Sequence, residues 1–406
     1  MQGLQLLRSQ ALSYYDLFIN SRYAPVIFVL IIAIVSYVIY YYVSTASSVS
    51  SLANITDIVS TASTNANAIY QPREAGRKSL NTLLTVGLTG TNQMNRYLIN
   101  FYILTANMAG LFTPAVNGVY DPSALKYAIR AGARGFIFDI YSSSVEKNYA
   151  PVLRVLQPGS NWKVQTINEM PLGLALDTLR KEGFDTGLSD NRHNDPMVLY
   201  FRFRGKIITS TLNLTAAAIR ATLEGYLVPT SENNSIPHQP IVNFTRKVLI
   251  FSNMASSDIA TTNFVDYCNS REGDVKGPAY NSYAPKDIIN ITDPTTIINN
   301  NKTTMAICAP NPEDTMGNDN NWMINTSDPS VSPIDNKGIN MVGLNFYSFV
   351  DGNVDAGLAS YITNNNKFGT YSFWMKPLNL QYAPEQTSPP QQNNLPATNG
   401  TPRPPA

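Results

Sequence analysis

The sequence predicts an α/β fold, a TIM-type (β/α) barrel preceded by a single transmembrane helix. Two observations carry this prediction. An uncharged apolar run lies near the N-terminus, and beyond it strand-like and helix-like segments alternate over roughly 300 residues. Alternation of this kind is typical of parallel strands joined by helical crossovers. Its length favours a closed barrel over an open sheet.

The apolar run covers residues 24–43 and contains no charged side chain and a single Ser. A bilayer core is crossed by about 20 apolar residues at about 1.5 Å each. Tyr37 and the three tyrosines at 40–42 gather at one end, as in the aromatic belt of a membrane helix. A buried core helix would carry a polar stripe, and a signal peptide would have a shorter apolar region with small residues at a cleavage site. The run therefore predicts a retained anchor.

The charged flanks of the apolar run predict its orientation. Arg8 and Arg22 precede it, and no Lys or Arg follows until Arg73. Because positive charge favours the cytoplasmic side, we expect the N-terminus inside and the large body outside or in a lumen.

The rest of the chain divides by composition. The prediction is a short cytoplasmic segment at 1–23, a Ser/Thr/Ala-rich stalk at 44–78, the barrel at 79–382 with Asn-rich insertions near 266–336, and a Pro-rich disordered tail at 383–406. A net charge of +1 argues against nucleic acid as a partner, because nucleic acid would require a clustered basic face. Cys268 and Cys308 could pair in an oxidising compartment or remain buried thiols, and the sequence leaves both open.

Apolar runs and helix signals place the elements of the barrel. The expected strands are 96–105, 135–141, 197–203, 247–253, 304–309, 339–346 and 371–375, and the expected helices are 121–131, 171–182, 214–227 and 354–364. The helix at 121–131 has the clearest boundaries. Asp121 is a suitable N-cap, Pro122 suits the first helical position, and Gly132 suits the end.

Few residues suggest catalysis. The chain has two histidines, His193 and His238, both in polar loops, and it has no phosphate-binding loop, nucleophile elbow, zinc-helix motif or cysteine cluster. A catalytic histidine pair would require both loops to fold over one site.

A succession of short motifs nevertheless resembles a known family. YILTANMAG, DPSALKYAIRAGARGFIFDIY, APVLRV, INEMPLGLALDTLR, DPMVLYFRF, KVLIFSN and MVGLNFYSF follow one another along most of the body. Their order and spacing resemble the X-region of phosphatidylinositol-specific phospholipase C and its phosphodiesterase superfamily. That resemblance implies an irregular TIM barrel with two catalytic histidines. Many members also bind calcium through an Asn, a Glu-x-Asp pair and a later Glu.

Carried onto this sequence, the family pattern implies a degenerate site. The first family histidine falls on Ala106 and the second near Val155, and neither side chain can transfer a proton. General acid–base groups typically contribute about 100- to 10,000-fold each, so the resemblance implies no useful turnover.

The calcium site is predicted lost as well. Asn107 keeps its ligand position, but the Glu-x-Asp pair falls on Ile137 and Asp139, and the later Glu falls on Arg202. Two oxygen ligands beside an arginine are too few for calcium. We expect Arg202 to pair with Asp139 instead.

These features predict a non-catalytic, membrane-anchored scaffold protein with protein partners. Its Asn- and Tyr-rich composition resembles membrane proteins of large DNA viruses, which would make it a minor capsid component or a link between virion membrane and capsid. Two alternatives remain. An active phosphodiesterase could use a rearranged site with His193, Glu146 or Asp139. A phosphate or lipid-headgroup receptor could use Arg202 and Arg204.

Overall fold

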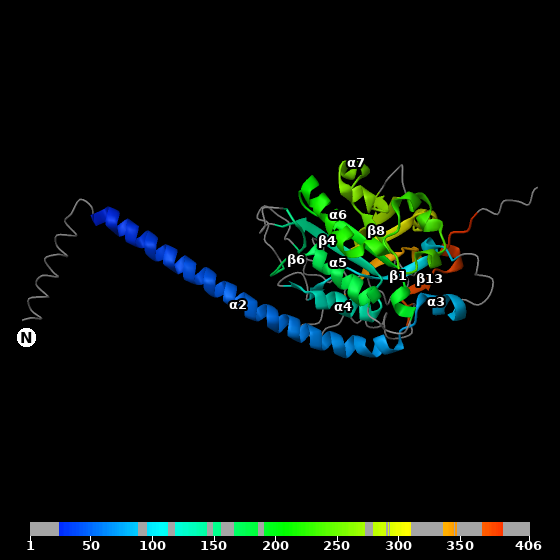
Figure 1. Cartoon of the computed structure of the whole chain (residues 1–406), viewed down its shortest axis with the longest axis horizontal. Helices are drawn as coiled ribbons and strands as arrows, with labels where there is room; N and C mark the ends of the chain where they lie inside the picture. Colours follow the sequence, from blue (N-terminus) through cyan, green and yellow to red (C-terminus); the bar gives the residue numbers. More distant parts are fainter. Residues whose placement is uncertain are drawn as a thin grey trace, which may run out of the picture.

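Eight parallel strands close into a ring at the centre of the fold. Figure 1 shows the computed structural model of the chain. The ring closes because β1 pairs in parallel with both β12 and β4. Its members, in chain order, are β1 (Phe101–Ala106), β4 (Gly135–Ser142), β7 (Met197–Phe203), β8 (Val248–Ser252), β9 (Ser270–Glu272), β10 (Ala279–Tyr283), β11 (Met305–Cys308) and β12 (Met341–Leu344). The expected (β/α) barrel is therefore present.

The structure describes most of the barrel and the helix that precedes it. The described residues are 24–87, 96–112, 118–143, 149–155, 166–185, 191–272, 279–289, 291, 293–309, 336–344, 346 and 368–384. The predicted cytoplasmic segment at 1–23, the helix at 354–364 and nearly all of the predicted tail lie outside these residues.

Short antiparallel strands extend the ring at both ends. The strand β13 (Phe373–Met375) pairs with the first half of β1. The strands β5 (Pro151–Leu153) and β6 (Met170–Pro171) continue from the last residues of β4. A separate pair, β2 (Leu111–Phe112) and β3 (Val119–Tyr120), follows β1. We call the C-terminal end of the parallel strands the mouth and the N-terminal end the base.

Helices cover the outside of the ring. The longer ones are α4 (Pro122–Ala131), α5 (Leu172–Arg180), α6 (Thr209–Leu223) and α9 (Thr295–Thr303); the shorter ones are α3 (Leu80–Thr82), α7 (Ser256–Ile259) and α8 (Pro285–Ile289). The helix α4 has the predicted boundaries. The Asp121 side chain accepts from the Ser123 backbone N–H, and Gly132 ends the helix with a φ of 109°, a left-handed conformation that suits glycine.

Tight turns and 3-10 or π segments connect these elements. They are η1 (Leu83–Gly87), η3 (Leu98–Asn100), η4 (Lys181–Asp185), η5 (Asn191–Asn194), η6 (Glu224–Tyr226), η7 (Thr230–His238), η8 (Ile241–Phe244), η9 (Asn263–Asp266) and η11 (Leu378–Leu380). The helix expected at 171–182 is α5 followed directly by η4, so the helical segment continues to Asp185.

Side chains alternate between the two faces of the ring, as the pleat of a strand requires. On β4, Phe136, Phe138 and Ile140 belong to the layer between ring and helices, whereas Ile137 belongs to the cluster inside the barrel. On β7, Tyr200 faces inward in the same way. Apolar residues therefore fill both layers, which explains the unbroken apolar runs in these strands.

A single helix of 53 residues, α2 (Ala24–Gly76), leads into the barrel. It occupies both the predicted span and most of the predicted stalk, so the stalk is helical. Its last third packs on the barrel through Ala62, Ala66 and Tyr70, which are buried. No helix within the described residues combines the length and the apolar character that crossing a membrane requires. Membrane insertion of residues 24–43 stays a prediction.

The direction of α2 relative to the barrel follows from its contacts. Near its C-terminal end, Glu74 lies 3.7 Å from Arg130, at the end of α4. Arg77, just past the helix, donates to the carbonyl of Ile129. Crossover helices such as α4 run from mouth to base, so α2 runs in the same direction. Its N-terminal part consequently projects beyond the mouth, as Figure 1 shows.

The expected insertion near 266–336 is wrong in part, because three barrel strands, β9, β10 and β11, lie inside it. Only β11 was expected. The strands β9 and β10 read SRE and AYNSY, without the apolar run that marks the other strands. Both strands form backbone hydrogen bonds with their parallel neighbours. Backbone pairing, rather than an apolar sequence, therefore defines β9 and β10 as strands.

Candidate functional site

Asp139 and Arg202, two residues of the site predicted from the sequence, lie inside the barrel near its mouth. The parallel register of β4 and β7 sets Asp139 directly opposite Arg202. Both side chains point inward, because Ile137 and Tyr200, two residues earlier on each strand, belong to the interior cluster. The C-terminal ends of β1, β4 and β7 therefore lie at one end of the barrel, because these strands are parallel.

Asp139 and Arg202 form a bidentate ion pair, as predicted. The Nε atom of Arg202 donates to Oδ1 of Asp139 at 2.6 Å, and Nη2 donates to Oδ2 at 2.7 Å. The Asp139 side chain is 0 % exposed and that of Arg202 is 5 % exposed. Two parallel N–H···O bonds between charged groups are among the stronger hydrogen bonds in proteins.

A second arginine completes a triad around the same carboxylate. The Nε atom of Arg204 donates to Oδ1 of Asp139 at 2.8 Å, and the Arg204 side chain is 21 % exposed. Burial by itself would raise the pKa of Asp139, but the charges and hydrogen bonds of Arg202 and Arg204 outweigh it and hold this pKa below its ordinary value. Asp139 is therefore ionised at neutral pH and satisfied by both guanidinium groups.

Glu272, at the end of β9, adds a second carboxylate to this end of the barrel. Burial raises its pKa, and the charge of Arg204 partly offsets that effect. Below these groups, Tyr200 and Tyr280 pack edge to face with ring centroids 5.4 Å apart, and the Tyr280 hydroxyl donates to the Ser252 carbonyl at 2.9 Å. The triad thus rests on a layer of packed aromatic rings.

The two site residues at the end of β1, Ala106 and Asn107, differ in their surroundings. Ala106 belongs to the layer beneath the helices, so its side chain points away from Asp139. Asn107 is 1 % exposed, and its backbone N–H donates to the Leu344 carbonyl at 2.9 Å. Its side-chain amide makes no hydrogen bond with the described residues. Asn107 directly follows β1. Of these two residues, it is the one that can share the barrel interior with Asp139.

Val155, the other predicted position, also lies outside the barrel interior. It follows β5 and is fully buried in the layer between ring and helices. Its backbone N–H donates to the Thr166 hydroxyl at 3.3 Å. An aliphatic side chain packed in this way has a structural role and cannot transfer a proton.

A second ion pair beside the mouth was not predicted. Arg154 pairs with Glu169, and the Ser143 hydroxyl donates to the other oxygen of the same carboxylate at 3.0 Å. The Arg154 guanidinium lies 5.2 Å from the Tyr141 ring centroid, in cation–π contact. This cluster ties β4 to β5 and β6. Fifteen positions separate its two charges, and no periodicity in the sequence marks such a pairing.

The remaining candidates lie away from the mouth. His193 belongs to η5, just before β7, and His238 ends η7, before β8, so both are on the base side of the barrel. His238 stacks on Tyr382 with centroids 4.3 Å apart. Glu146 lies outside the described residues. Among the residues that the structure describes, no three His, Cys, Asp or Glu side chains are arranged to hold a metal ion.

The two cysteines are not joined in the disulfide that the sequence left open. Cys308 ends β11, whereas Cys268 lies two residues before β9, and β10 runs between those strands. Strands lie about 4.8 Å apart, so two strand spacings exceed the roughly 7 Å that a disulfide can bridge between Cα atoms. Both thiols are buried, and burial raises the pKa of Cys308.

Comparisons with known proteins find similarity in shape rather than in sequence. No family model matches the chain, and no curated protein is similar to it. Among solved structures, PLC21 of L. pealei has a TM-score of 0.48 and 14% identity, covering 69% of this chain and 37% of PLC21. A calcium-dependent phosphoinositol-specific phospholipase C of Pseudomonas sp. has a TM-score of 0.43 and 12% identity, covering 69% of this chain and 95% of the enzyme.

A mutant phosphatidylinositol-specific phospholipase C of Staphylococcus aureus has a TM-score of 0.40 and 14% identity, covering 67% of this chain and 93% of the enzyme. The chain thus spans little more than a third of PLC21 but nearly the whole length of the bacterial enzymes. These neighbours are phospholipases C, the family that the sequence motifs resemble. At these TM-scores and identities, the barrel assignment rests on the closed parallel strand pairing of the chain itself.

Proposed function

We propose that this protein is a non-catalytic, membrane-attached structural protein in which an ion-paired triad occupies the end of the barrel where related folds carry a site. The observation that supports this proposal is the buried carboxylate of Asp139, held by Arg202 and Arg204. A carboxylate bound by two arginines is a poor base, because its pKa is held low. It is also a poor calcium ligand, because both oxygens already accept hydrogen bonds from arginine.

The alternative of a phosphate or headgroup receptor is less favoured by the same geometry. Arg202 would have to leave Asp139 to bind a phosphate, and a buried carboxylate would then lose its bidentate partner. Breaking a buried ion pair in this way costs about 3–5 kcal/mol. Arg204 is partly exposed, but it shares the same carboxylate and also faces the charge of Glu272.

An active phosphodiesterase with a rearranged site is also less favoured. His193 and His238 lie on the base side, at the opposite end of the barrel from Asp139. They could not exchange protons with a substrate bound at the mouth.

The course of α2 supports the attachment part of the proposal. Seven large apolar side chains in its first turns are at least half exposed: Val26, Val29, Leu30, Ile32, Ile34, Val35 and Tyr37. The C-terminal part of α2 packs on the barrel, and its N-terminal part projects beyond the mouth. A membrane span at 24–43 would therefore place the membrane on the side of the barrel where the mouth lies. A place in a virion, between membrane and capsid, remains a prediction from composition alone.

A hydrolysis assay tests the proposal. The full chain, reconstituted in nanodiscs, should release no product from phosphatidylinositol or a glycerophosphodiester, with or without calcium. Titration calorimetry should show no calcium binding. The control is the Asp139→Asn variant, which lacks the charge at the triad. Turnover by the wild-type chain that disappears in Asp139→Asn would overturn the non-catalytic reading and favour the rearranged enzyme.

A further inference from the structure

The segment at 371–382 lies at the base of the barrel, at the end opposite the triad. It contains β13, which pairs with the first half of β1, and η11, which follows β13. The Lys376 backbone N–H donates to the Asn100 carbonyl at 2.9 Å, and the Tyr382 backbone N–H donates to Oδ1 of Asn100 at 2.7 Å. We call residues 371–382 the clamp, because they contact the residue before β1 at two points.

Two basic side chains lie between the clamp and the rest of the barrel. Lys376 is 2 % exposed, and its Nζ donates to the Asn301 carbonyl and to Oδ1 of Asn340, both at 3.3 Å. His238, at the end of η7, stacks on Tyr382 with ring centroids 4.3 Å apart. Both bases therefore join the clamp to other elements through uncharged partners.

No carboxylate offsets the burial of these two bases in the part of the chain that the structure describes. Burial lowers the pKa of Lys376 to about 7. Burial also lowers the pKa of His238, and a hydrogen bond with the backbone of Thr303 acts in the opposite direction. The other titratable side chains described on the clamp and next to its contacts are basic residues and tyrosines, namely Arg96, Tyr97, Tyr283, Lys302, Lys337, Tyr371 and Tyr382.

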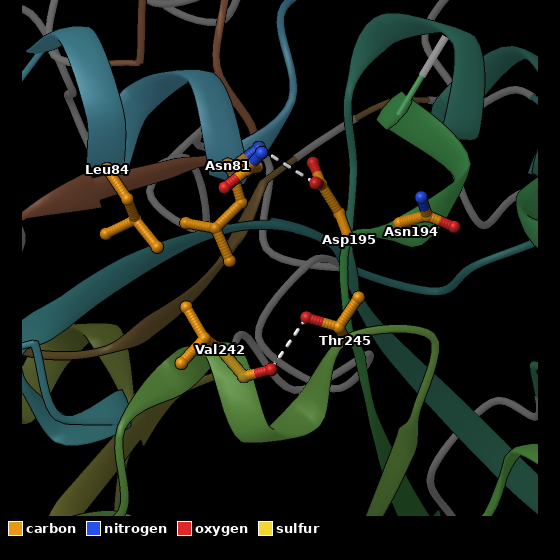
Figure 2. A pocket seen from close by; sticks show the side chains of 7 residues that line it. Asn81, Leu84, Asn194, Asp195, Val242 and Thr245 are labelled. Carbon is orange, nitrogen blue, oxygen red and sulfur yellow. Dashed lines mark hydrogen bonds between the residues drawn. The ribbon is translucent and has the colours of Figure 1, made fainter. Parts of the chain in front are cut away.

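Two acidic residues on neighbouring elements bind elsewhere. Asp293 precedes the first turn of α9, about 12 Å along the helix from Asn301. Asp195 lines a pocket of about 260 Å³ at the base, where its Oδ1 accepts from the Leu80 backbone N–H at 2.8 Å (Figure 2). Neither carboxylate acts on the pKa of either base. Protonation of a base beneath the clamp therefore places an uncompensated charge in a buried position, which is costly.

We propose that the clamp is a proton-sensitive device, which detaches from the base of the barrel as the pH falls. In the detached state, Lys376 and the ring of His238 reach water, which solvates their charged forms. Detachment also separates β13 from Phe101–Ile103 of β1 and exposes the backbone groups of that strand edge. The clamp lies at the end of the barrel opposite the triad, so this inference does not depend on the proposed function.

Proton binding sets the direction of the effect. Because the pKa of Lys376 is about 7 in the attached clamp and 10.5 in water, the detached state binds more protons between these values. Detachment is therefore favoured as the pH falls through this window, by up to about ninetyfold between pH 9 and pH 6. His238 adds to the effect as the pH falls below its ordinary 6.5, because burial lowers its pKa in the attached state.

Hydrogen exchange followed by mass spectrometry tests the proposal on the full chain in nanodiscs. The protection of the clamp's backbone N–H groups, corrected for the intrinsic exchange rate at each pH, should fall at least about tenfold between pH 9 and pH 6. At pH 6, the backbone N–H groups of β8 should remain at least about tenfold better protected than those of the clamp, because β8 exchanges only when the whole barrel opens. Comparison with β8 thus separates detachment of the clamp from global unfolding.

Two variants and a matched control identify the responsible groups. Lys376→Met removes the titrating amine and should reduce the fall between pH 9 and pH 6 to less than about threefold. His238→Phe keeps a ring for Tyr382 and should remove the further fall between pH 6.5 and pH 5. Lys206→Met, at an exposed position after β7, should behave like the wild type.

Circular dichroism of each variant establishes that it is folded. Protection of the clamp that stays constant between pH 9 and pH 6 would overturn the proposal. So would equal protection of the clamp and β8 at pH 6, or a fall that both Lys376→Met and His238→Phe leave unchanged.

Discussion

Removing the carboxylate of Asp139 tests the central structural argument. In Asp139→Ala, the Arg202 guanidinium would remain buried after losing two charge-assisted hydrogen bonds, and Arg204 would lose one. Removing one partner of a buried ion pair typically costs about 3–5 kcal/mol, since the other charge stays desolvated. Arg204 is 21 % exposed and can turn towards water, so its lost hydrogen bond adds little to the destabilisation. We expect the free energy of unfolding to fall by about 3–5 kcal/mol.

Urea denaturation followed by near-ultraviolet circular dichroism measures this change, because that signal reports the packing of aromatic rings inside the barrel. Asp258→Ala, at an exposed position on α7, is the matched control and should stay within about 0.5 kcal/mol of the wild type. The double variant Asp139→Leu/Arg202→Met removes both charges and should lose less stability than Asp139→Ala. A loss below about 1 kcal/mol in Asp139→Ala would refute the claim that the pair is buried and coupled.

Further predictions concern other groups. Because the pKa of Asp139 lies below its ordinary 3.8, the triad's stabilisation should persist at neutral pH and fade only as the pH falls below about 4, measured by acid titration of stability. Lys376 is buried with a pKa of about 7, against an ordinary 10.5. The unfolded chain therefore binds more protons between these values, so stability should rise with pH there, and Lys376→Met should flatten that slope. Gly135→Ala should lower the melting temperature, because its Cβ would lie 2.2 Å from the Thr105 hydroxyl oxygen; an unchanged value would contradict the packing of β1 on β4. Deleting residues 1–43 should release the barrel from membranes in a flotation assay, and persistent flotation would count against a single anchor.

The surroundings of Lys376 explain why the pKa of its ammonium group is lowered. Its Nζ lies 3.3 Å from the Asn301 carbonyl and 3.3 Å from Oδ1 of Asn340, both uncharged oxygens. Burial lowers the pKa of Lys376, and no carboxylate of the described part of the chain acts against that effect. Two acceptors match the two N–H groups of a neutral amine.

Sequence by itself determined much of the architecture. The apolar runs of β1, β4, β7 and β8 and the caps of α4 were predicted, because burial on both faces and helix-terminus hydrogen bonds leave local patterns. The pairing of Asp139 with Arg202 was also predicted. It followed from the family resemblance, which implies that both residues occupy ligand positions of one site, and the parallel register sets them side by side.

Tertiary structure alone decided the rest. The polar strands β9 and β10 are defined by backbone bonds to their neighbours, which no local pattern announces. The pleat decided that Ala106 faces the helices rather than the barrel interior, since a shift of one residue reverses a side chain. Arg154 pairs with Glu169 beside the β5–β6 pair, and the Leu80 N–H bonds to Asp195 across 115 positions of the chain. Such contacts depend on three-dimensional proximity, which residue order does not encode locally.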